Sequence, residues 1–217
     1  MRIGEPVLRG VFVGRPESRG QAGSGAWHDE PWTTGIFKQA AAEPVTVTST
    51  GLAGDGQADL VHHGGPDKAL CAYSADHYPE WRRRLGLADF AFGAFGENVT
   101  IDGLVESAVC IGDTWAMGGV MLQVSQPRQP CWKLARRWRL TTLTREVVDS
   151  GWTGWYFRVL RGGVLTTGLP LSLLERPHPG WTIDAANRVM HGGTGDRRAL
   201  GAVPELSESW RRALSTP

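Results

Sequence analysis

Short apolar segments separated by glycine turns constrain the fold of this chain more than any other feature. Segments rich in Val, Phe, Leu and Trp occur at residues 6–14, 44–51, 68–73, 109–127 and 155–175, and their lengths and residue types are those of strands. Gly118-Gly119 and Gly162-Gly163 lie inside two of these segments, where each pair predicts a hairpin turn. Roughly seven short strands with few crossover helices predict a mainly β, α+β fold built on a closed or nearly closed β-barrel.

The sequence changes character near Pro179, where we predict a boundary. Three short helical segments follow, and Thr182 and Ser207 are suitable N-cap residues for two of them. We therefore predict a β-barrel domain over residues 1–178 and a small three-helix domain over residues 179–217.

The charge balance and the cysteine content exclude several classes of function. The 217 residues carry 23 basic and 22 acidic side chains, so the net charge is +1 and no overall field attracts nucleic acid or an anionic membrane. No apolar run approaches the roughly 20 residues that span a bilayer, and the first residues lack the apolar core of a signal peptide. Three cysteines, an odd number, favour free thiols in a reducing compartment. We expect a cytoplasmic protein without nucleic-acid or membrane partners.

One cysteine lies in a setting suited to chemistry. The stretch "VSQPRQPCWKLARRW", residues 124–138, places Cys131 directly after Pro130, where a helix is predicted to begin. Helix N-termini favour anions, and Arg128 and Lys133 add positive charge nearby, so the thiolate needed for nucleophilic attack or metal binding is favoured. The alternative is a small buried side chain at a helix start, and local chemistry alone leaves both interpretations open.

The other two cysteines and the basic run after Cys131 are predicted to be structural. Cys71 and Cys110 have apolar neighbours and are expected in the core. Arg136 and Arg137 are expected on the exposed face of a helix, with the tryptophans of the same stretch in the core.

The stretch "HHGGPDKA", residues 62–69, is a candidate binding loop. It begins with His62 and His63, and Gly64 lets the backbone approach a ligand closely and offer its N–H groups. Asp67 and Lys68 add one charge of each sign. An ordinary surface turn is the alternative when this stretch is considered alone.

Two further loops carry polar side chains in glycine-rich surroundings. In "GAFGENV", residues 93–99, Glu97 and Asn98 precede a strand, and the Asn98 amide offers both a donor and an acceptor to a heterocycle edge. "TGIFK" ends in Lys38, just after a long connector at residues 15–35. Ordinary loop chemistry is the alternative for both.

Taken together and in this order, these segments resemble the MOSC family, named after the C-terminal domain of molybdenum-cofactor sulfurase. More narrowly they resemble its stand-alone bacterial branch, the YiiM-like proteins. The resemblance covers about residues 10–176, and the helical tail is similar to the three-helix segment of that branch. The resemblance rests on six segments: "TGIFK", "GLAGDGQADLVHHGGPDKAL", "GAFGENVTIDGL", "VCIGDTWAMGG", "VSQPRQPCWKLA" and "GWYFRVLRGG".

This resemblance implies a β-barrel that holds the pyranopterin molybdenum cofactor, with Cys131 as the metal ligand. Molybdenum favours sulfur donors, and a ligating thiol is deprotonated. The cofactor's phosphate would take its positive charge from Lys38, Lys68 and Arg128, and His63, Asp67 and Asn98 would face the pterin or the metal's oxygen ligand. The implied catalytic residues are Cys131, His63 and Glu97, the candidate proton donors are His62, His63 and Glu97, and the implied cofactor-binding residues are Lys38, His62, His63, Gly64, Asp67, Lys68, Asn98 and Arg128.

The resemblance also implies an activity, which is the reduction of N-hydroxylated compounds such as hydroxylamino bases, a detoxifying reaction. No haem or cluster motif is present in the sequence, so the electrons would come from a separate reductase. Three alternatives remain open: a sulfur carrier that uses a Cys131 persulfide, a cofactor-binding module without activity, and a Cys–His hydrolase. The helical tail could form a homodimer surface or cap the barrel.

Overall fold

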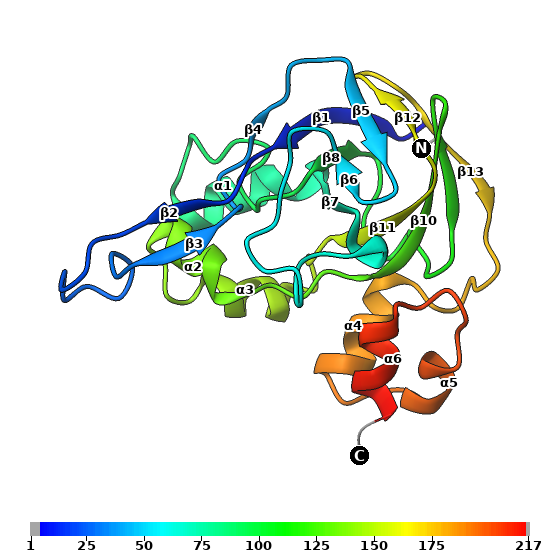
Figure 1. Cartoon of the computed structure of the whole chain (residues 1–217). Coiled ribbons are helices and arrows are strands. Elements are labelled where there is room, and N and C mark those ends of the chain that lie inside the picture. Colours follow the sequence, from blue (N-terminus) through cyan, green and yellow to red (C-terminus); the bar gives the residue numbers. More distant parts are fainter. Residues whose placement is uncertain (1–4, 216–217) are drawn as a thin grey trace.

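A curled eight-stranded sheet is the largest element of the computed structural model, which describes residues 5–215 (Figure 1). Only β7 and β8 run parallel among its neighbouring strands. The predicted strands near residues 6–14, 68–73 and 109–127 are confirmed. The strand order is β13 (Leu171–Glu175), β9 (Thr114–Met117), β10 (Val120–Pro127), β11 (Trp155–Arg161), β7 (Leu70–Ser74), β8 (Val99–Asp102), β1 (Val7–Val13) and β4 (Gln39–Ala40).

The sheet curls into a half-barrel whose two ends approach each other. The Leu8 N–H donates to Leu169 O at 2.9 Å, and the Leu171 N–H donates to Pro6 O at 2.8 Å, so the start of β1 is joined to the segment that leads into β13. Buried apolar side chains of the strands, among them Leu122 and Phe157, fill the interior. The predicted nearly closed barrel in an α+β fold agrees with this arrangement.

A smaller sheet contradicts one of the two predicted hairpins. Gly118-Gly119 does turn β9 into β10, whereas β12 (Gly163–Leu165), after Gly162, does not pair with β11. It pairs with β5 (Val45–Thr48), which pairs in turn with β6 (Gly51–Leu52). The physical reason is a close backbone approach, because a Cβ atom on Gly162 would lie only 2.5 Å from Val47 O.

The connector at residues 15–35 forms a hairpin that reaches away from the barrel (Figure 1). Its strands are β2 (Glu17–Arg19) and β3 (Trp32–Thr34). Arg136, from α2 (Trp132–Trp138), donates hydrogen bonds to His28 O and Glu30 O. Arg137 donates to Ile36 O at 2.6 Å and to Gly93 O at 2.8 Å. The prediction that these arginines form an exposed face was therefore wrong, because Arg136 joins the connector to α2 and Arg137 joins α2 to Ile36 and to the loop at Gly93.

Two more helices, α1 (Tyr78–Leu85) and α3 (Leu143–Ser150), lie with α2 on one side of the sheet (Figure 1). A second core of mainly aromatic side chains fills this side, including Tyr78, Trp81 and Phe95. Two 3₁₀ turns, η1 (Pro66–Lys68) and η2 (Ala75–His77), flank β7.

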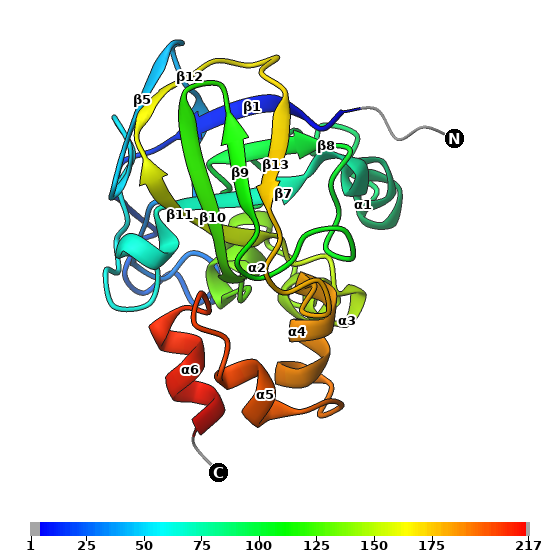
Figure 2. The same ribbon diagram turned by 90° about the vertical axis from the view of Figure 1, so that its right-hand side faces the viewer.

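The chain ends in the three predicted helices, α4 (Ile183–His191), α5 (Arg197–Gly201) and α6 (Glu208–Ser215), which gather below the barrel (Figures 1 and 2). Both predicted N-caps are confirmed, because the Thr182 side chain accepts from Ala185 N at 3.0 Å and the Ser207 side chain accepts from Trp210 N at 3.3 Å. Buried side chains of these helices join the barrel's own core cluster. The boundary at residue 179 therefore stays a prediction. Within the described part of the chain, no helix is long and apolar enough to cross a bilayer.

Candidate functional site

A small inner cavity and a wider outer hollow adjoin where β10 runs into α2. The inner cavity measures about 80 Å³ and the outer hollow about 700 Å³. The two share one set of lining residues, so they form a continuous site: His63, Lys68, Gln129, Cys131, Lys133 and Tyr156.

Cys131 lies at the junction of the two hollows. It is the N-cap residue of α2, with an extended backbone, so the predicted helix start after Pro130 is confirmed. Its carbonyl accepts hydrogen bonds from Leu134 N at 3.1 Å and from the Thr144 hydroxyl at 3.2 Å, which fix its backbone. The side chain is half-buried and is not part of a disulfide. A thiol in this position can reach a ligand in either hollow.

Arg128 supplies a buried positive charge to the inner cavity. The residue is 6% exposed, and its Nη2 donates to Phe95 O at 2.6 Å. Its Nη1 is buried and has no hydrogen-bond partner among residues 5–215. A buried charged donor without a partner is costly, and an anionic ligand would satisfy it.

His63 lies half-buried among positively charged side chains. Burial, together with the nearby charges of Lys133 and Arg128, lowers the pKa of His63 to about 4. Burial also lowers the pKa of Lys68, whose ammonium donates to His62 O at 2.7 Å. The imidazole of His63 is therefore neutral at pH 7 and is surrounded by groups suited to an anion.

Lys38 and Asn98 line the inner cavity but are already engaged with protein partners. Lys38 forms a buried ion pair with Asp55. The side-chain oxygen of Asn98, Oδ1, accepts from Cys71 N at 3.0 Å. Its side-chain nitrogen, Nδ2, donates to Asp55 at 2.8 Å and to Phe12 O at 3.3 Å. The side-chain groups of Asn98 hold β1, β7 and Asp55 together, and its contact with a heterocycle stays a prediction. Asp55, whose role the sequence did not suggest, is the hub of this cluster.

Glu97 points away from the site, and its predicted role as a catalytic proton donor is wrong. The residue is 0% exposed and lies against Tyr78 of the aromatic core. Its carboxylate accepts from the Tyr78 hydroxyl, from Thr100 Oγ1 at 2.8 Å, and from the backbone N–H groups of Gly93 and Phe95. It organises the "GAFGENV" loop and does not line the cavity.

Asp67 also turns away from both hollows, against the prediction that it contacts a cofactor. It accepts from Arg158 at 2.5 and 2.9 Å and from Glu208 N at 3.0 Å. Ser125 Oγ donates to its carbonyl. Asp67 therefore joins the "HHGGPDKA" loop to β11 and α6, and so positions Lys68.

The first and third residues of the same loop lie at the periphery. The His62 side chain is 74% exposed, lines only the outer hollow and contacts Asp59 at 2.8 Å through Nδ1. Gly64 lines neither hollow, and a Cβ atom there would lie 3.0 to 3.3 Å from atoms of Leu60. Gly64 is therefore needed for packing of the loop, not for contact with a ligand in these hollows.

Two residues of the cavity wall, Cys71 and Tyr156, were not predicted from the sequence as site residues. Cys71, predicted as a core residue, lines the inner cavity, where burial raises the pKa of its thiol to about 11. Tyr156, on β11, lines both hollows, and burial raises the pKa of its hydroxyl well above the ordinary value. Apolar flanks place such residues in a strand but do not tell a core position from a cavity wall. Both side chains keep their protons at neutral pH.

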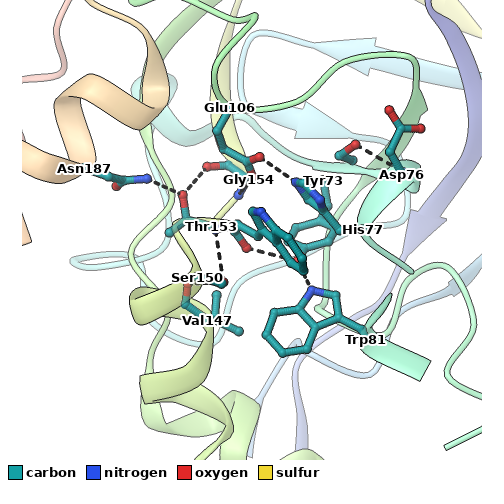
Figure 3. Close-up of polar contacts among 12 residues, drawn as sticks. Tyr73, Asp76, His77, Trp81, Glu106, Val147, Ser150, Thr153, Gly154 and Asn187 are labelled. Atoms are coloured by element: carbon teal, nitrogen blue, oxygen red, sulfur yellow. Dashed lines mark hydrogen bonds and ion pairs between the residues drawn. The ribbon is translucent and has the colours of Figure 1, made fainter. Parts of the chain in front are cut away.

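A buried polar network around Glu106, Thr153 and Gly154 (Figure 3) is joined to the backbone of Arg128. The Arg128 N–H donates to Gly154 O at 3.0 Å, and the Gly154 N–H donates to Glu106 at 2.8 Å. The other oxygen of Glu106 is 2.6 Å from Nε2 of His77, and the Thr153 hydroxyl links the network to Asn187 of α4 at 2.9 Å. The strand end that carries Arg128 is thus fixed by contacts that reach the C-terminal helices.

Comparison with known proteins agrees with this architecture. The MOSC domain family matches residues 59–172. The chain is 45% identical over 184 residues to the uncharacterized protein YflK of Bacillus subtilis, covering 83% of each chain. It is 38% identical over 173 residues to the protein YiiM of Escherichia coli, covering 77% of each. It is also 38% identical to a protein of Gibberella moniliformis named "Reductase", covering 80% of this chain and 31% of that one.

Solved structures give the same result. The crystal structure of YiiM from Geobacillus stearothermophilus superposes with a TM-score of 0.79 at 35% identity, covering 96% of this chain and 97% of that one. The structure of YiiM from Escherichia coli superposes with a TM-score of 0.72 at 33% identity, covering 82% and 86%. The chain therefore belongs to the MOSC domain family, in its YiiM-like branch.

Proposed function

We propose that this protein is a molybdenum-cofactor-dependent oxidoreductase that reduces N-hydroxylated compounds. The observation that carries the proposal is the junction of a half-buried thiol, Cys131, with a cationic cavity in which Arg128 has an unsatisfied buried donor. Membership of the MOSC family supports binding of the molybdenum cofactor. The name of the Gibberella moniliformis relative supports an oxidoreductase.

The residues of the site fit an anionic, metal-bearing group. Cys131 would supply a thiolate ligand to the metal, and Arg128 and Lys68 would bind the cofactor's phosphate through charge-assisted hydrogen bonds. The Lys38 charge is partly balanced by Asp55, so Lys38 is expected to contribute less. When bound, the cofactor supplies the two-electron chemistry, and the protein supplies binding, orientation and electrostatics.

The proposed reaction converts R–NHOH, two electrons and two protons into R–NH₂ and water. The electrons come from a separate reductase, and the N–O bond is the bond that breaks. His63 is neutral at pH 7, so its ring offers one N–H donor and one acceptor nitrogen to a substrate in the hollow that it shares with Cys131. Tyr156 holds its proton at neutral pH and can donate a hydrogen bond into either hollow.

The proposal includes the compartment, the substrate class, the partner and the oligomeric state expected from the sequence. The protein acts in the cytoplasm on a small N-hydroxylated substrate and uses a reductase as its partner, without nucleic acid or membrane. A homodimer through the helical tail remains part of the proposal, and size-exclusion chromatography with light scattering tests it.

The test is turnover by cofactor-loaded protein. Protein made in a host that synthesises the molybdenum cofactor is reduced with methyl viologen, given an N-hydroxylated amidine, and assayed for the amidine product. We expect product from the wild type and from Cys110→Ser, and none from Cys131→Ser. Cys110 is a matched control because it is buried and lines neither hollow among the described residues. Loaded, reduced wild type that makes no product would contradict the proposal.

A further inference from the structure

The outer hollow has an aromatic wall beside Cys131. Trp132 follows Cys131 in the chain, is 51% exposed and lines this hollow together with Trp32 of β3. The two rings lie 5.6 Å apart with their planes inclined by 51°. The expected place of Trp132 in the core is therefore wrong, because its ring forms part of the surface of the hollow.

The wall is held in place by cations. The Arg136 guanidinium lies 5.1 Å from the Trp32 ring centre and 5.5 Å from that of Trp132, and the Lys133 ammonium lies 5.9 Å from Trp132. Arg136 is itself fixed by the carbonyls of His28 and Glu30. A wall fixed in this way loses little conformational entropy when a ligand binds.

The chemistry of the two hollows differs. The inner cavity is lined by Lys38 and Arg128, whereas the tryptophans line only the outer hollow. Cys131 borders both. A phosphate-bearing group therefore fits the inner side, and the outer side offers an aromatic surface next to the thiol. Flat π-systems stack on tryptophan independently of hydrogen bonding.

We propose that Trp132, supported by Trp32 and Arg136, is a specificity-determining residue that selects flat heteroaromatic substrates carrying the N–OH group. The proposal rests on the proposed function and adds to it the residue that sets a preference for ring compounds over open-chain ones. Asp59 and Gln129, which also line the outer hollow, can receive polar edge groups of such a ring.

The experiment compares N4-hydroxycytosine with hydroxyurea, which carries the N–OH group without an aromatic ring. In cofactor-loaded protein, Trp132→Ala is expected to raise KM for N4-hydroxycytosine about five- to 150-fold, which is the effect of losing one stacked ring. The KM for hydroxyurea rises by a clearly smaller factor, so the ratio of the two KM values changes, and Trp132→Phe keeps most of the affinity for N4-hydroxycytosine. Trp27→Ala is the matched control, because Trp27 is also exposed and lines neither hollow in the described structure.

A second readout needs no turnover. Cytosine, the amine product, is titrated into the protein and its binding is followed by ligand-observed NMR, which Trp132→Ala weakens by the same factor. Equal KM changes for both compounds, or unchanged cytosine binding in Trp132→Ala, overturn the proposal. Loaded wild type that reduces neither compound contradicts the proposed function instead, and the cytosine titration still tests the tryptophan wall.

Discussion

Replacing Arg128 by methionine is expected to raise the stability of the cofactor-free protein and to weaken its binding of an anionic ligand. The guanidinium is buried, and its Nη1 has no partner in the described residues. Burying a charge costs several kcal/mol, of which the bond to Phe95 O returns about 1.5–3 kcal/mol. Methionine has a similar length and no charge, so we expect a net gain of about 1–2 kcal/mol in the free energy of unfolding.

The two effects of Arg128→Met are measured separately. A gain of this size raises the Tm of the cofactor-free protein by about 2–8 °C. Loss of a charge-assisted bond to the cofactor's phosphate weakens cofactor retention by about 10- to 100-fold. Differential scanning calorimetry gives the first quantity, and molybdenum per chain after dialysis gives the second.

Arg158→Met is the matched control for this prediction. Arg158 is bound to Asp67 at 2.5 Å and to Gln123 at 2.6 Å, so the same substitution leaves a carboxylate without its partner and lowers the Tm. The reasoning is refuted if Arg128→Met lowers the Tm as Arg158→Met does and retains molybdenum like the wild type.

Three further predictions concern stability. Glu97→Gln puts an amide where a carboxylate accepts four hydrogen bonds. We expect this variant to lower the free energy of unfolding, measured in urea, by about 1–3 kcal/mol. An unchanged free energy would contradict the structural role assigned to Glu97. The pKa of His63 is lower in the folded chain than the ordinary 6.5, so the folded state binds fewer protons and stability falls as the pH drops from about 6.5 to 4. His63→Gln flattens this slope in thermal melts of the cofactor-free protein, and a slope unchanged in that variant would exclude His63 as its origin. Gly162→Ala places a methyl group 2.5 Å from Val47 O and is expected to cost about 1–3 kcal/mol, whereas Gly119→Ala, with no atom within 4 Å, costs little; equal losses would remove the steric explanation.

Much of the barrel could be predicted because its strands are encoded locally. Alternating apolar residues and the Gly118-Gly119 turn define β9 and β10 in the sequence itself. Gly162-Gly163 has the same composition, but its conformation follows from the approach of Val47, which is more than 100 residues away. Long-range contacts of this kind leave no local pattern.

The candidate site could be predicted in part for the same reason. His63, Lys68, Arg128 and Cys131 line the hollows as the motifs indicate. Glu97 was misassigned because a carboxylate in a glycine loop can face either a ligand or the loop's own N–H groups. Only the folded loop decides between these two arrangements.

The arginines of α2 show a second limit of the sequence. A basic helix face is usually solvated, and nothing in the sequence near these residues signals that the connector at residues 15–35 folds back onto Arg136 or that Arg137 binds the carbonyl of Ile36. The same packing turns Trp132 toward the outer hollow with Trp32 beside it. Residues of the inner cavity were therefore easier to predict than the aromatic wall that adjoins it.

The most direct test of the central claim is the molybdenum content of wild type, Cys131→Ser and Cys110→Ser, expressed side by side in a host that makes the cofactor. We predict nearly equimolar molybdenum in the wild type and in Cys110→Ser, and its loss in Cys131→Ser with an unchanged circular dichroism spectrum. Full molybdenum occupancy in Cys131→Ser would contradict the ligand assignment. A wild type without molybdenum but with a one-sulfur adduct on Cys131 would instead identify a sulfur carrier.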